Sequence, residues 1–125
     1  MQTSNGEDRE TGRLIGSDKV EGTPVNDRAG NKLGNVERVM IDKQTGRVAY
    51  AVLSFGGFLG IGERYHPLPW SLLDYDTAQA AYVVDLDRDT LERAPTIGRE
   101  ERVDWDLSAY GRQIHDFYRV APYWM

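Results

Sequence analysis

Apolar residues recur along the middle of the chain at the alternating spacing of β-strands. The first such stretch runs from Lys32 to Asp42, and its alternation changes phase between Val36 and Val39, which a β-bulge explains. A second stretch follows from Arg47 to Phe55. The four residues between them, Lys43 to Gly46, end on a glycine that adopts the left-handed backbone conformation without strain. The pattern therefore predicts a long β-hairpin.

The second strand of this hairpin is apolar on both faces: Val48, Tyr50 and Val52 alternate with Ala49, Ala51, Leu53 and Phe55. A strand with two apolar faces needs cover on both sides. One face is expected to line the core, and the other needs a helix, a loop or a second subunit. The chain offers one long helix, predicted over Trp105 to Tyr118. Its apolar positions recur at spacings of three, four and three, at Leu107, Tyr110, Ile114 and Phe117. This helix is the candidate cover, from the same chain or from a second subunit.

Shorter strands are predicted at Thr23–Asn26, at Tyr65–Trp70 with an extended continuation to Tyr75, and at Ala80–Leu86. Pro67 and Pro69 stand two apart, so both lack an N–H on the same side, which an edge strand tolerates. A capping-box pattern at Asp89 predicts that a short helix begins there and ends at Ala94-Pro95.

Five segments in this order resemble the PRC-barrel domain: Leu33-Gly34-Asn35-Val36, Met40-Ile41-Asp42, Thr45-Gly46-Arg47-Val48, Pro67-Leu68-Pro69-Trp70 and Leu91-Glu92-Arg93-Ala94-Pro95. That domain occurs in the cytoplasmic part of the photosynthetic reaction centre H subunit, in free-standing bacterial proteins and, in related form, in a bacterial ribosome-maturation factor. The resemblance implies a mostly β fold, a small antiparallel barrel with a short helix after the last strand. We expect a disordered arm over residues 1–13, the barrel over 14–97 and a helical extension with the amphipathic helix over 98–125.

Composition narrows the possible functions. The chain has 125 residues, of which 40% are hydrophobic and 28% charged, and its net charge is −5. An acidic balance disfavours non-specific binding to nucleic acid or an anionic membrane, so no direct nucleic-acid partner is expected. The chain has no cysteine, which excludes thiolate catalysis and disulfides and fits a reducing compartment. No apolar run is long enough for a membrane span, and no apolar leader is seen at the N-terminus. The expected location is the cytoplasm.

Two segments suggest a ligand site. Gly56 to Gly62 contains four glycines, but a phosphate-binding loop normally opens onto a helix, and a strand is predicted here. Asp85, Asp87 and Asp89 alternate as at the start of a calcium loop, yet the required glycine and glutamate are Thr90 and Thr96. We favour a flexible connection for the first and solvated or helix-capping carboxylates for the second.

The two histidines, His66 and His115, have no spacing suited to a zinc pair. His66, beside Pro67 in a strand, is expected to be structural. His115 flanks the apolar stripe of the helix and is expected to be exposed. We predict no catalytic residue, no cofactor and no metal.

These observations favour a non-enzymatic interaction or assembly module that forms a homodimer or binds another protein. The predicted interface residues lie on the glycine-rich loop and the apolar stripe: Phe58, Leu59, Ile61, Leu107, Tyr110, Ile114 and Phe117. One alternative is a small-ligand or metal-binding barrel. A second, by fold analogy, is an RNA- or ribosome-associated or reaction-centre-related protein.

Overall fold

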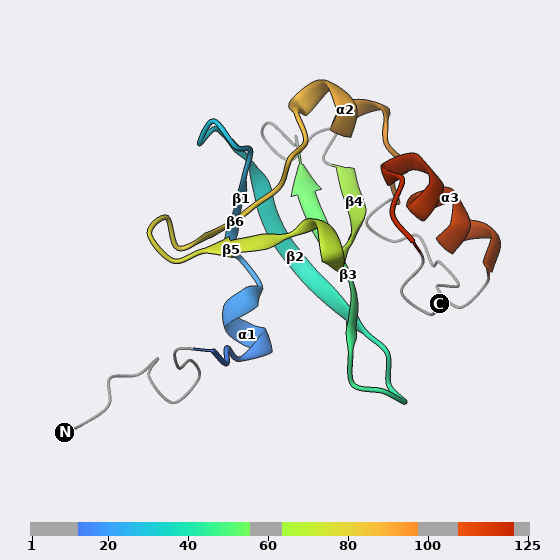
Figure 1. Ribbon diagram of the computed structural model, residues 1–125, viewed down its shortest axis with the longest axis horizontal. Coiled ribbons are helices and arrows are strands. Elements are labelled where there is room, and N and C mark those ends of the chain that lie inside the picture. Colours follow the sequence, from blue (N-terminus) through green and yellow to red (C-terminus); the bar gives the residue numbers. More distant parts are fainter. Residues whose placement is uncertain (1–12, 56–63, 98–107, 122–125) are drawn as a thin grey trace.

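A six-stranded sheet forms the body of the protein in the computed structural model, which describes residues 13–55, 64–97 and 108–121 (Figure 1). The strand order is β4-β3-β2-β1-β6-β5. The strands are β1 (Pro24–Asn26), β2 (Lys32–Ile41), β3 (Val48–Phe55), β4 (Arg64–Pro69), β5 (Asp74–Asp76) and β6 (Ala81–Val83). The helices are α1 (Ser17–Val20), the 3-10 helix η3 (Trp70–Leu72), α2 (Arg88–Arg93) and α3 (Ser108–Tyr118). The predicted arm over residues 1–13 falls almost wholly outside the described residues.

The predicted hairpin is confirmed. β2 pairs antiparallel with β3, and the register shifts between Val36 and Arg38, where the bulge was expected. Gly46 has φ +79°, and the Asp42 carboxylate accepts hydrogen bonds from the backbone N–H groups of Gln44 and Thr45. The turn therefore uses the left-handed glycine and the side-chain acceptor that its sequence offers.

The mostly β fold class is also confirmed, with two differences from the predicted antiparallel barrel. β1 pairs with β6 in parallel, and the strand order does not close on itself in the described part of the chain. Alternating apolar residues show which face of a strand is buried but not which distant strand lies beside it. The β1–β6 pairing joins Val25 to Tyr82, and the sequence pattern of neither strand specifies that contact.

Two local predictions need correction, and one short helix was not foreseen. The chain turns through η3 at Trp70–Leu72, where a continuous extended segment was expected. The helix expected to begin at Asp89 spans Arg88–Arg93, and its N-cap is Asp87, whose carboxylate accepts from the Thr90 N–H. The capping pattern was correct in kind but shifted by two residues, because alternating aspartates offer more than one possible cap. α1 had not been predicted.

β3 is buried on both faces, as its sequence indicated, and only Val48 and Ser54 are less than fully buried. The inner face belongs to the main core, with Ala51, Leu53 and Phe55 beside residues of β1, β2, β4, β6 and α2. On the outer face, Val52 packs with Tyr65 and with Ile97, which forms an isolated bridge to β4. α3 packs beside β4 of the same chain and contributes Ile114 and Tyr118 to the core cluster. His115 of α3 contacts Tyr50 on the outer face, so the C-terminal helix covers part of that face within the same chain.

Both edges of the sheet resist further strand pairing. β4 is an edge strand, as Pro67 and Pro69 predicted. Its Tyr65 carbonyl already accepts a hydrogen bond from Ile97, and the two prolines have no N–H to offer. At the other edge, β5 is three residues long and carries two aspartates. Short, charged edges disfavour association by strand addition.

Candidate functional site

Tyr50 and His115 meet where α3 packs on the outer face of the sheet. The Tyr50 hydroxyl lies 3.1 Å from His115 Nε2, and the two rings are 5.5 Å apart. Tyr50 is 1% exposed and His115 is 2% exposed, so the expectation of an exposed His115 is wrong. His115 follows Ile114 on the helix, and both side chains are buried. The sheet therefore covers a wider strip of the helix than its apolar residues alone define.

Burial affects the charge state of His115. Loss of hydration lowers the pKa of His115, and the backbone carbonyls of Val120 and Ala121 and the nearby Asp116 carboxylate oppose that effect only in part. The imidazole is therefore neutral near pH 7. A neutral imidazole engaged with a tyrosine hydroxyl stabilises the contact between α3 and β3 as a buried hydrogen bond.

A cavity of about 170 Å³ lies beside this contact. It forms where the start of β3, the start of η3 and the end of α3 converge, and its polar lining residues are Arg47, Trp70, Ser71 and His115. Nothing in the local sequence pattern indicated this cavity, because its walls come from three segments at least twenty residues apart.

His66 is placed on the inner face of β4, where it is 1% exposed. Its ring lies edge-on to Phe55 at 5.2 Å. The structural interpretation of this histidine is consistent with that position, since it is enclosed by core residues rather than directed into a cleft.

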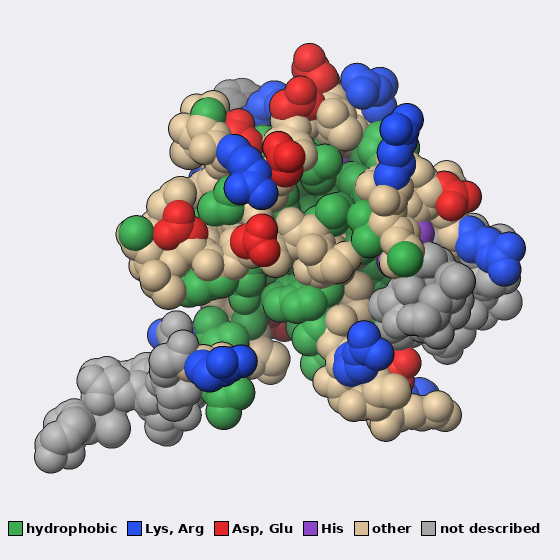
Figure 2. Space-filling model, viewed as in Figure 1, with side chains coloured by type: hydrophobic (Ala, Val, Ile, Leu, Met, Phe, Trp, Pro, Cys, Tyr) green, Lys and Arg blue, Asp and Glu red, His purple; other side chains and the backbone are tan. Residues whose placement is uncertain are grey.

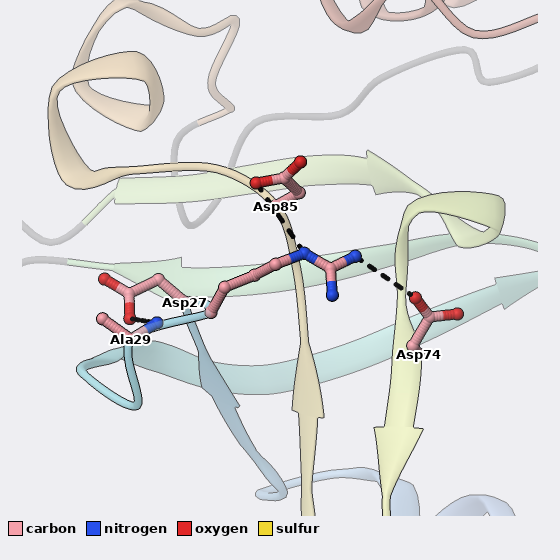
Figure 3. Close-up of polar contacts among 5 residues, drawn as sticks. Asp27, Ala29, Asp74 and Asp85 are labelled. Carbon is pink, nitrogen blue, oxygen red and sulfur yellow. Dashed lines mark hydrogen bonds and ion pairs between the residues drawn. The ribbon is translucent and has the colours of Figure 1, made fainter.

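The three alternating aspartates do not converge on one point. Asp85 lies 3.8 Å from the Arg28 guanidinium, which also approaches Asp74 at 3.9 Å (Figure 3). Asp87 caps α2 instead. Among the described residues, no group of three or more His, Cys, Asp or Glu side chains is arranged to hold a metal ion.

Several exposed carboxylates serve as local turn acceptors. The Asn31 backbone N–H lowers the pKa of Asp27, and the Gln79 side chain lowers the pKa of Asp76. Hydrogen bonds from the Thr90 side chain and backbone lower the pKa of Asp87. These groups are held ionised, whereas a general acid at neutral pH needs a raised pKa.

Figure 2 shows charged side chains around the α2 end of this face, above a centre of apolar side chains.

The predicted interface residues fall into three groups. Phe58, Leu59, Ile61 and Leu107 lie outside the described residues. Tyr110 lies in the described backbone of α3, without a described side-chain environment. Ile114 is fully buried within the chain, and Phe117 is half-buried with its ring 5.0 Å from that of Tyr118. The structure therefore brings Ile114 onto its own sheet, and the use of the other residues by a partner stays a prediction.

One exposed apolar residue that the sequence did not single out is Ile41, which is 51% exposed near the end of the β2–β3 hairpin. Its cross-strand partner is Val48. The signal was present in the alternation, since Val48 shares a face with Tyr50 and Val52. It was overlooked because the bulge changes the face on which the residues of β2 lie.

Comparison with known proteins places the chain in a family. The sequence profile of the PRC-barrel domain matches residues 13–91, which is more than half of the chain, so the chain belongs to the PRC-barrel family. No curated protein matches it. A similar solved structure is RimM from Pseudomonas aeruginosa, described as a 16S ribosomal RNA processing protein, with 23% identity and a TM-score of 0.39. The match covers 58% of this chain and 44% of that one, so it spans less than half of the RimM chain.

Within the described residues, no helix combines the length and apolar character that crossing a membrane requires.

Proposed function

We propose that this PRC-barrel chain is a non-enzymatic interaction or assembly module that acts as a homodimer in the cytoplasm. Family membership supports a barrel module. The non-catalytic role is supported by the way the described titratable groups are used. His115 is buried against Tyr50, and the aspartates with lowered pKa values accept local hydrogen bonds. The absence of cysteine agrees with a reducing compartment.

The observation that supports the dimer is an apolar pair on the outer face of the hairpin, the exposed Ile41 and the half-buried Val48. Val48 shares its face with Tyr50, which α3 covers, and Ile41 is the cross-strand partner of Val48. The hairpin extends away from the rest of the molecule beyond that cover (Figure 1). Ile41 remains 51% exposed there, and Met40 is half-buried.

A second copy of the chain suits this surface better than an added strand would. Both sheet edges are blunted, so the contact has to be made through side chains. A two-fold contact brings the same patch to itself, with each Ile41 packing on the partner's hairpin. Asp42 and Lys43 stand next to each other at this end of the hairpin, so both charge signs are available at the rim of such a contact.

The test is the molar mass of the full chain by size-exclusion chromatography with light scattering at micromolar concentration. We expect twice the monomer mass of 14.2 kDa. The Ile41→Lys variant should weaken the dimer at least tenfold, because two half-exposed isoleucines contribute about 2 kcal/mol when both become buried.

Leu14→Lys is the matched control, because Leu14 is 73% exposed and precedes α1, which lies apart from the turn end of the hairpin (Figure 1). It should leave the mass unchanged. A monomer at every concentration would end the homodimer proposal, and equal weakening by both variants would end the assignment to the hairpin.

A further inference from the structure

The cavity beside Tyr50 and His115 has the size of a small-molecule site. Its volume is about 170 Å³, which corresponds to about five or six water molecules at ~30 Å³ each. Drug-sized ligands occupy larger pockets. Three elements build its walls, so a molecule inside would contact β3, η3 and α3 together.

The lining has one sign of charge. Arg47 is the only charged residue among those that line the cavity in the described part of the chain. Ser71 adds a hydroxyl, and His115 adds a buried imidazole. This is a local exception in a chain of net charge −5. A guanidinium with a neighbouring hydroxyl recognises a carboxylate through charge-assisted hydrogen bonds.

The rest of the wall is apolar or aromatic, with Pro69, Trp70 and Ala121 among its residues. Such a wall favours a ligand whose carboxylate is attached to a compact apolar or flat body. A free inorganic anion would leave these surfaces without contacts, and a long acid would exceed the volume.

We propose that this cavity is a binding site for a small monocarboxylate with a compact apolar body, about the size of benzoate. Arg47 and Ser71 hold the carboxylate at the mouth, and the body lies against Trp70 and Pro69, toward His115. The bound molecule joins β3 and η3 to α3, so binding stabilises the docking of the helix on the sheet. All of its described residues come from one chain, so the site can be tested separately from the proposed dimer, although Val48 belongs both to its wall and to the proposed dimer contact.

The test is an NMR titration of the ¹⁵N-labelled full chain with sodium benzoate at pH 7 and constant ionic strength. Saturable shifts are expected at the Trp70 indole N–H and at the backbone amides of Arg47 to Ala49 and of His115. The expected dissociation constant is on the order of millimolar, as for a ligand of about nine heavy atoms. Trp70→Phe assigns the indole signal among the three tryptophans.

Two comparisons distinguish recognition of the carboxylate from non-specific binding. Benzamide has the same body without the charge and should bind at least tenfold more weakly. Arg47→Gln should weaken benzoate at least tenfold, and its matched control Arg93→Gln, an exposed arginine on α2, should leave binding unchanged.

Thermal unfolding gives an independent measurement, since a ligand that binds only the native state raises the midpoint in proportion to the logarithm of its excess. Three outcomes would each overturn the proposal. They are NMR chemical shifts that change linearly with benzoate concentration without saturating, equal binding of benzamide, and unchanged binding in Arg47→Gln. None of these outcomes bears on the molar mass of the chain, so failure here is distinct from failure of the dimer.

Discussion

Acidification should weaken the docking of α3 through His115. This residue is 2% exposed and lies 3.1 Å from the Tyr50 hydroxyl. Burial lowers the pKa of His115 below its ordinary value of 6.5. In the unfolded chain the imidazole regains that ordinary value, so the unfolded state binds a proton at a higher pH than the folded state does. The contribution of His115 to stability is therefore fully present above pH 6.5. It decreases as the pH falls below that value and is lost below the folded-state pKa.

The size of the loss follows from the same relation. Each unit by which the pKa lies below 6.5 corresponds to about 1.4 kcal/mol. For a chain of 125 residues, that loss lowers the thermal midpoint by about 4–8 °C. The Val120 and Ala121 carbonyls and the Asp116 carboxylate favour protonation, and they offset the effect of burial only in part.

The assay is urea unfolding of the wild type and of His115→Gln at pH 7.5 and pH 5.0. Glutamine keeps a hydrogen-bonding side chain but does not titrate. His66 and the carboxylates are common to both proteins, so the difference between their losses isolates His115. Wild type should lose more stability on acidification than the variant. Hydrogen exchange should show the added opening at the amides of α3.

Equal losses in the two proteins would refute the reasoning. If His115→Gln does not fold, NMR titration of the His115 ring in the wild type decides the matter instead. A pKa of 6.5 or above would then show that burial does not control this residue.

Two further predictions concern the sheet and the N-cap of α2. Gly34→Ala should destabilise the fold by about 3 kcal/mol in urea unfolding, because an added Cβ would run into the Ser54 carbonyl oxygen of β3; a change below about 1 kcal/mol would contradict that close approach. Asp87→Ala should lower the thermal midpoint by about 4 °C through loss of the α2 N-cap. Asp89→Ala is its matched control. A larger effect at Asp89 than at Asp87 would mean that Asp89 is the N-cap, as the sequence first indicated.

Much of the local structure could be predicted because its causes are local. The turn at Gly46 needs a left-handed residue, and the prolines of β4 confine that strand to an edge. The bulge after Val36 follows from the change of phase in its own strand. Helix starts were less certain, since Asp87 and Asp89 both offer a capping carboxylate and only the path of the chain selects between them.

The sequence by itself determined that β3 would be covered on both faces and that the C-terminal helix was the candidate cover. Tertiary structure decided that the helix covers its own chain, that His115 is buried against Tyr50, and that Arg47, Ser71 and His115 line one cavity. The physical reason is that periodicity reports the environment of one element at a time. Contacts between residues as distant as Tyr50 and His115 depend on how the elements pack, and no local pattern records that arrangement.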